Sequence, residues 1–153
     1  MARIEDLVKS EQVHMRKLPL PTYETTPWAG GPPLSERRVA IVTTAGLGIR
    51  GEEAFGFGAV DYRVIPVETD SADILMTHVS VNFDRTGFQD DVNVVFPIDR
   101  LREMLADGEI GSIAEFHYSF MGATDPELLE GSARALAGML REDQVNAVLL
   151  SPV

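Results

Sequence analysis

The sequence predicts an α/β fold with a mostly parallel sheet flanked by helices, and three observations support this. Apolar runs typical of strands lie at 38–44 and 116–121. Segments that begin at Pro97 and Thr124 place apolar residues at helical spacing. The unbroken apolar run at 147–150 is typical of a parallel strand that is buried on both faces. Strands that alternate with helices in this way indicate an α/β domain.

The first 34 residues have a different character from the rest of the chain. Residues 3–18 carry a partial apolar stripe and predict a helix. Residues 19–34 contain five prolines and a pair of glycines, which predicts an extended Pro-rich arm. We expect Trp28 to hold this arm against the body, because the side chain would otherwise expose a large apolar surface. The predicted organisation is therefore an N-terminal helix and arm at 1–34, followed by an α/β domain at 35–153 that is incomplete at its C-terminus.

The remaining strands and helices follow from local signals. Residues 62–67 predict an edge strand, since Pro66 has no backbone N–H to donate to a neighbouring strand. A short strand is expected within 73–79, and a polar connection at 80–93. Pro97 opens a helix that Gly108 closes. The helix at 124–141 has a capping box formed by Thr124 and Glu127.

Composition narrows the function classes. The chain has 153 residues and a net charge of −11, with a balance of +2 over residues 1–50 and −13 over residues 51–153. Such an acidic body disfavours nucleic-acid binding. No apolar stretch is long enough to span a membrane and the N-terminus does not resemble a signal peptide, so we expect a cytoplasmic protein. The absence of cysteine excludes a disulfide, a thiolate metal site or a cysteine nucleophile within these residues.

Residues 46–51 match the pattern G-x-G-x-x-G and follow a predicted strand. A dinucleotide site also needs a helix that opens at the third glycine, so that its N-terminus faces the phosphates. The sequence that follows has further glycines, two glutamates and no helical period. The glycine-rich stretch at 46–58 is therefore interpreted as a loop, with a lid over a site as one alternative.

The densest group of polar side chains follows the strand expected at 73–79. His78 and Asp84 could pair as a base and the carboxylate that orients it. On the predicted strand at 116–121, His117 and Ser119 face the same side. We take these four residues as catalytic candidates. Each also has a structural interpretation, as a capped histidine in a polar turn or a histidine packed in the core.

The polar residues of the chain also raise two alternative kinds of enzyme, a metal-dependent hydrolase and a serine hydrolase. The two histidines with Asp84 or Asp91 could ligate a metal in a hydrolase, although no tight spacing motif supports a metal and none is assigned. A serine hydrolase lacks its G-x-S-x-G motif. A non-catalytic domain that binds a small ligand or a partner subunit also stays open.

Several segments together resemble one family, and the blocks at 78–104 and 108–124 are the specific ones. The chain is similar to the selenoprotein B family of glycine, betaine, sarcosine and D-proline reductases. The matching segments are VAIVTTAG at 39–46, DYRVIP at 61–66, HVSVNFDRTGFQDDVNVVFPIDRLREM at 78–104, GEIGSIAEFHYSFMGAT at 108–124 and NAVLLSPV at 146–153.

The resemblance implies reductive cleavage of a C–N bond in a small amine or amino acid, driven by dithiols. It also implies a partner reductase subunit, which in this family can carry a pyruvoyl group. The family nucleophile is a selenocysteine or cysteine directly after the strand matched by residues 147–151. In this sequence that position falls just past Val153, so we expect a UGA codon there and expect residues 1–153 alone to be inactive. No cofactor is expected within the chain itself.

The resemblance gives no secure roles for side chains, so substrate-binding candidates are chosen by residue type and by position near strand ends. An unpaired final strand would also favour self-association or a homo-oligomer. The candidates are Thr43, Thr44, Gly46, Asn82, Asn93, Tyr118 and Ser151.

Overall fold

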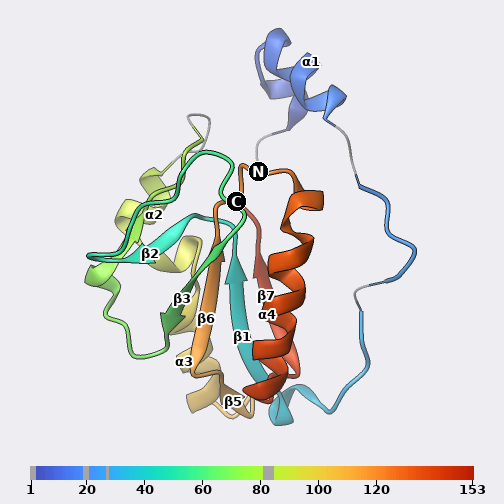
Figure 1. The fold of residues 1–153 in the computed structure, drawn as a ribbon. Coiled ribbons are helices and arrows are strands. Elements are labelled where there is room, and N and C mark those ends of the chain that lie inside the picture. The colour runs from blue at the N-terminus through green and yellow to red at the C-terminus, as the bar shows by residue number, and fades with distance from the viewer. Residues whose placement is uncertain (1–2, 19–20, 27, 81–84) are drawn as a thin grey trace.

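The computed structural model describes residues 3–18, 21–26, 28–80 and 85–153, and it shows a sheet with helices on both faces (Figure 1). This confirms the predicted α/β class. The strands of the main sheet are β1 Arg38–Thr43, β3 Tyr62–Pro66, β5 Ser112–Ile113, β6 Phe116–Phe120 and β7 Ala147–Ser151.

The first strand, β1, lies in the middle of the main sheet. On one side it pairs in parallel with β5 and then β6, and on the other side it pairs in parallel with β7. The strand β3 pairs antiparallel with β6 and forms the outer edge, as Pro66 predicts. The chain thus runs from β1 to β6 on one side and then crosses β1 to reach β7. This is a doubly wound arrangement, in which the strand order reverses next to the first strand.

Two short strands form a second, antiparallel sheet. The strand β2 covers Leu47–Ile49, inside the stretch that was expected to be entirely loop, and it pairs with β4, Ile74–Met76. The expectation of an unstructured loop at 46–58 is therefore wrong for its first part. Its second part, which returns to β3, contains no helix or strand.

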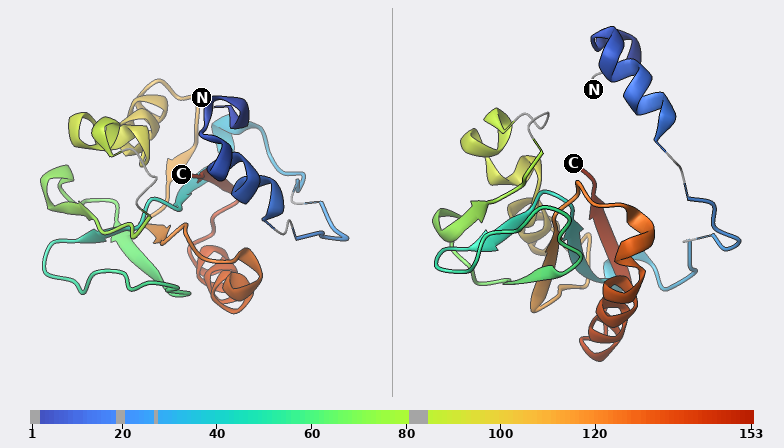
Figure 2. Two further views of the ribbon diagram at one scale, coloured as in Figure 1. Left: turned by 90° about the horizontal axis from the view of Figure 1, so that it is seen from above. Right: turned by 45° about the horizontal axis from the view of Figure 1, so that its top comes forward.

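Two helices, α3 and α4, cover opposite faces of the main sheet (Figure 2). The helix α3, Ile98–Ala106, packs Ile98 and Leu101 on one face, and α4, Glu130–Glu142, packs Leu136 on the other. The N-terminal helix α1, Lys9–Lys17, buries no side chain. The remaining helical elements are α1 Lys9–Lys17, α2 Thr86–Asp90 and 3₁₀ turns at Ile4–Asp6, Leu34–Glu36, Ser71–Asp73, Val92–Val94 and Pro126–Leu129.

The helix ends follow the sequence signals with one exception. Pro97 lies at the N-cap of α3, and Gly108 adopts a φ of +71° just past the end of that helix. The predicted capping box of Thr124 and Glu127 is wrong. The side chain of Asp125 accepts the Glu127 N–H, while the Thr124 hydroxyl donates to the Ala59 carbonyl. Asp125, one residue later, is the N-cap of the 3₁₀ turn that precedes α4, and its carboxylate is a strong N-cap acceptor.

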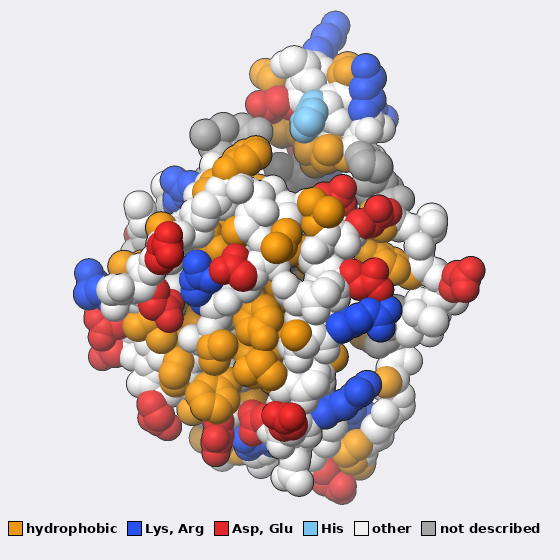
Figure 3. Space-filling view, in the orientation of Figure 1, with side chains coloured by type: hydrophobic (Ala, Val, Ile, Leu, Met, Phe, Trp, Pro, Cys, Tyr) orange, Lys and Arg blue, Asp and Glu red, His pale blue; other side chains and the backbone are white. Residues whose placement is uncertain are grey.

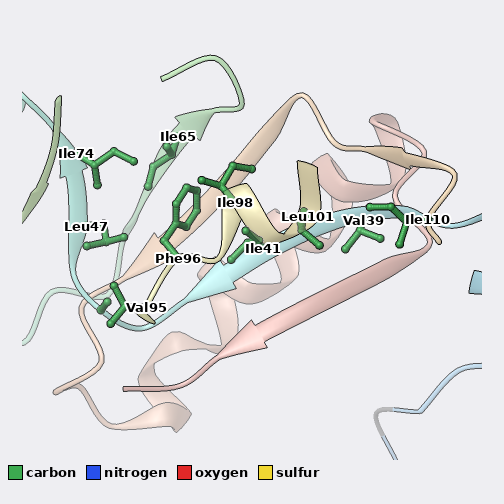
Figure 4. Close-up of a cluster of buried hydrophobic side chains, with 11 residues drawn as sticks. Val39, Ile41, Leu47, Ile65, Ile74, Val95, Phe96, Ile98, Leu101 and Ile110 are labelled. Carbon is green, nitrogen blue, oxygen red and sulfur yellow. The ribbon is translucent and has the colours of Figure 1, made fainter. Parts of the chain in front are cut away.

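The core has two parts, one on each face of the sheet. The larger cluster lies between β1, β2, β3, β4 and α3 and includes Ile41, Leu47, Ile65 and Phe96 (Figure 4). The smaller cluster lies under α4, where Leu136 packs on side chains of β6. Its buried members are Tyr118, Phe120 and Leu136.

Two predicted burials are wrong. The apolar run of β7 forms a parallel strand, as expected, and pairs with β1, yet Leu150 remains 66% exposed and Val148 40% exposed, because β7 lies at an edge of the sheet. Trp28 is 90% exposed, so it does not hold the N-terminal segment against the body. Residues 21–26 and 28–33 contain no helix or strand, and the extended arm itself stays a prediction.

The surface is mixed in chemical character. Acidic side chains are scattered over the face seen in Figure 3, while hydrophobic side chains gather over β3 beside α4. Within the part of the chain that the structure describes, no helix is both long and apolar enough to cross a membrane.

Candidate functional site at the carboxyl ends of β1, β6 and β7

Three hydroxyl side chains form a row across the last ladder position of the parallel strands. Thr43 of β1 is in register with Ser119 of β6 on one side and with Ser151 of β7 on the other. Residues in register on parallel strands face the same side of the sheet, so the three side chains share the α3 face. The structure therefore brings together three candidates that are far apart in the sequence.

Two of these hydroxyls are committed to the fold. Thr43 is fully buried, and its hydroxyl donates to the Ser151 carbonyl at 3.1 Å and accepts the Ala45 N–H at 3.2 Å. Ser119 is also fully buried, and its hydroxyl accepts the Leu47 N–H at 2.8 Å. The hydroxyl of Ser151 makes no hydrogen bond within the described part of the chain. Of the row, it is the one available to a ligand.

The end of β7 is tied to the end of β1. The Val153 N–H donates to the Thr44 hydroxyl at 2.9 Å, and the Thr44 N–H donates to the Ser151 carbonyl at 3.1 Å. On the other side, the Gly122 N–H donates to the Thr44 carbonyl at 3.0 Å. A Cβ at position 122 would lie 2.5 Å from that carbonyl oxygen, so the approach requires glycine.

The importance of Gly122 was missed from the sequence. The signal that could have found it is a glycine one residue after the apolar end of a strand, which often marks a close backbone approach.

The turn after β1 packs against His78. Gly46 has a φ of +65°, and a Cβ there would lie 2.9 Å from the Cα of His78. The Thr77 N–H donates to the Gly46 carbonyl at 2.8 Å. The end of β4 and the end of β1 therefore lie side by side, and His78 is brought to the same edge of the sheet as Thr44.

His78 is neutral in this setting. Its side chain is 6% exposed, and its Nδ1 accepts the Ser80 N–H at 3.1 Å. Burial, with a smaller contribution from the Arg85 cation, lowers the pKa of His78 below its ordinary value. The lowered pKa keeps this imidazole uncharged at neutral pH, and because Nδ1 accepts a hydrogen bond, Nε2 carries the ring proton.

His117 lies deeper in the sheet than the hydroxyl row. It is fully buried, its Nδ1 accepts the Ile41 N–H at 3.0 Å, and its ring lies edge-on to Phe96 at 5.5 Å between centroids. This hydrogen bond to Ile41 lies between the residues of β1 that pair with β5 and the residues of β1 that pair with β6. Burial, followed by the Arg102 cation, lowers the pKa of His117 to about 4. This places a neutral imidazole as a link between two strands.

Tyr118 and Asn93 lie away from the hydroxyl row. Tyr118 is 1% exposed on the α4 face, edge-on to Tyr62 at 5.7 Å, and burial raises the pKa of its phenol. The Asn93 amide donates to Asp91 at 2.8 Å and to Asp99 at 2.9 Å, while its oxygen accepts the Asp99 N–H. These hydrogen bonds lower the pKa of both carboxyls and fix the start of α3.

The two remaining candidates, Asn82 and Asp84, lie outside the described residues. Among the residues that are described, no three histidine, aspartate or glutamate side chains come together as a metal site. The G-x-G-x-x-G stretch forms β2 and is followed by no helix, so its geometry does not match a dinucleotide site.

The position of the site follows from the topology. In doubly wound sheets, ligands bind in the crevice outside the carboxyl ends of the strands where the strand order reverses. Here the order reverses between β1 and β7, the strands that end at Thr43 and Ser151. A ligand at this crevice would meet the Ser151 hydroxyl and the turn that Gly46 forms.

Comparison with known proteins connects this site to a family. The model of the family described as glycine/sarcosine/betaine reductase selenoprotein B matches residues 7–153. The chain is 31% identical to the D-proline reductase subunit gamma of Acetoanaerobium sticklandii over 121 residues, which are 77% of this chain and 49% of that protein. It is 29% identical to the sarcosine reductase complex component B subunit beta of Peptoclostridium acidaminophilum, over 87% of this chain and 32% of that protein. It is 28% identical to the glycine reductase complex component B subunit gamma of Carboxydothermus hydrogenoformans, over 88% of this chain and 32% of that protein.

The chain thus spans between a third and a half of the length of these curated relatives. No solved structure matches it significantly. The family match covers nearly all of the chain, including every strand and the hydroxyl row. The chain therefore belongs to the glycine/sarcosine/betaine reductase selenoprotein B family.

Proposed function

We propose that this chain is the part of a reductase subunit that builds the crevice between β1 and β7, where a C–N bond of a small amine or amino acid is cleaved reductively. The observation that carries the proposal is the joined end of β1 and β7, with Thr44 holding Val153 and Ser151 beside it. The relatives that are reductase subunits for D-proline, glycine and sarcosine support the reaction class.

The reactive atom is proposed to be a selenol or thiol carried by the residue that follows Val153. A selenol or an activated thiol is ionised near neutral pH and attacks an activated carbon directly. Since the Val153 N–H is bound to Thr44, the next residue would begin at the crevice. The absence of cysteine from residues 1–153 is consistent with a nucleophile outside them.

The side chains of this region would then position the substrate, and none of them would be the nucleophile. The Ser151 hydroxyl is proposed to hydrogen-bond the substrate, and Thr43 fixes the Ser151 backbone through its carbonyl. Neutral His78, at the same edge of the sheet, is proposed to orient the substrate. In the overall reaction a dithiol is oxidised to a disulfide, and its two electrons convert the C–N bond to C–H and N–H bonds. A pyruvoyl group would be carried by a partner subunit, and no residue of this chain is assigned to it.

An assay of the assembled enzyme tests this proposal. The protein is purified with its partners from cells that carry the gene, and dithiol-dependent cleavage is measured as release of amine from glycine, sarcosine and betaine and as formation of the ring-opened amino acid from D-proline. We expect cleavage of at least one substrate of this class, and none by residues 1–153 alone. A fully assembled complex that cleaves no C–N bond in any of them would contradict the proposal.

A pair of serine variants tests the position of the site. Ser151→Ala removes the available hydroxyl at the crevice and is expected to lower kcat/KM by about tenfold or more. Ser112→Ala is the matched control, since Ser112 lies in register with Arg38 at the opposite end of the same sheet. Equal effects of the two variants would place the site elsewhere.

A further inference from the structure

The outer edge of β7 lacks the features that protect an exposed strand. Its residues 147–151 contain no charged residue and no proline, and Val148, Leu149 and Leu150 are 40%, 38% and 66% exposed. The opposite edge strand, β3, carries Arg63 and ends in Pro66, as exposed edges commonly do. The edge of β7 therefore has the composition of an interior strand.

Both faces of β7 are incompletely covered. Val148 and Leu150 are in register with Ala40 and Val42 of β1, and Val42 packs in the cluster under α4. Residues in register face the same side, so Val148 and Leu150 lie on the α4 face, where α4 leaves them partly exposed. Leu149 lies on the opposite face. Among the described residues no strand pairs with the outer edge of β7, and its apolar side chains are exposed on both faces, a pattern typical of a strand that further structure covers.

The topology indicates what the missing layer is. The crossover from β6 through α4 to β7 moves the chain across β1, and α4 covers one face on the way. Parallel crossovers are almost always right-handed. A further crossover that continues in the same direction would therefore place its helix on the α4 face, where Val148 and Leu150 are exposed, and its strand against the free edge of β7.

We propose that β7 is an interior strand in the assembled protein, covered by a helix beside α4 and paired with a further parallel strand, both supplied by polypeptide that follows Val153. The relatives provide the required length, because the chain spans only 49% of the D-proline relative and 32% of the others compared. This inference rests on the proposed function, in which the nucleophile also follows Val153. It adds that the following segment completes the sheet and closes one wall of the crevice.

A substitution made at two chain lengths tests the inference. Leu150→Glu is introduced into residues 1–153 and into the protein translated past the Val153 codon, with cysteine in place of any selenocysteine. Leu150 is largely exposed in the short chain, so the change should shift its Tm by less than about 2 °C. In the long chain the carboxylate would be buried without a partner, and Tm should fall by about 6 °C or more. Leu128→Glu, at a side chain that is 63% exposed on the turn before α4, is the control and should have a small effect at both lengths.

Amide hydrogen exchange of the unsubstituted proteins provides a second measurement, in case the long variant does not fold. Peptides that cover residues 145–153 should exchange at least about tenfold more slowly in the long chain, with β6 peptides as an internal reference. Equal exchange at both lengths would overturn the inference. A stable dimer at both lengths that Leu150→Glu separates would also overturn it, because a second copy would then cover β7. A long chain that protects β7 but cleaves no amine would contradict only the proposed function.

Discussion

At the scale of single residues, the sequence identified several of the right side chains but not their partners. Ser119, Thr43 and Ser151 are each polar residues at the end of an apolar run, which a reader of the sequence can see. Their alignment into one row depends on strand register, and register is set by packing across the sheet rather than by any one segment. The commitment of Thr43 and Ser119 to backbone groups was likewise not predictable.

His117 gives a pH-dependent contribution to stability. Its pKa is about 4 in the folded protein, against an ordinary value of 6.5, so the unfolded chain binds more protons between these values. The free energy of unfolding should therefore fall as the pH decreases from about 6.5 to about 4, by about 3 kcal/mol for this one fully buried group. Denaturant unfolding at a series of pH values measures the slope.

The variant His117→Gln removes the titrating group and should flatten this slope, whatever its effect on stability at neutral pH. His14→Gln, in the exposed helix α1, is the control and should leave the slope unchanged. Burial also lowers the pKa of His78, so part of the slope is expected to remain; a slope as steep in His117→Gln as in the unsubstituted protein would contradict the assignment to His117.

At the scale of elements, local signals predicted most helices and strands correctly and failed where a neighbour decides the outcome. Pro97 and Gly108 bounded α3 because they act through their own backbone geometry. The cap of the turn before α4 was assigned to Thr124 instead of Asp125, since Thr124 is drawn to the Ala59 carbonyl. The short strand β2 was missed because it exists only through its pairing with β4.

The amino end of the sheet is held by a largely buried ion pair. Arg38 binds the Asp143 carboxylate, donates to the Ile113 carbonyl and so joins β1 to β5 and to the turn before β7. Asp143→Ala would leave Arg38 without its partner and should lower the free energy of unfolding by about 2–3 kcal/mol. Glu130→Ala breaks the exposed pair with Arg134 on α4 and should cost less than about 0.5 kcal/mol.

Chemical denaturation of both variants measures the difference. Similar small losses would show that the Arg38–Asp143 pair is as weak as a surface pair. That result would show that this ion pair does not hold the turn before β7 against β1.

At the scale of the whole molecule, the class of fold and the family were accessible from the sequence, and the exposure of β7 was not. An apolar run of four residues predicts burial on both faces, and nothing in the run reveals that β7 lies at an edge of the sheet within residues 1–153. The topology then supplies what the sequence could not, namely that the strand order reverses between β1 and β7. The candidate site and the free edge are consequences of this one reversal.

The central proposal is that a selenol or thiol is carried by the residue that follows Val153. Mass spectrometry of the protein purified from its native cells tests this proposal directly. We expect a peptide that continues past Val153 with a selenium-containing residue or a cysteine, and we expect iodoacetamide to alkylate that residue at neutral pH. A native protein whose final residue is Val153, or whose next residue carries neither selenium nor sulfur, would contradict it.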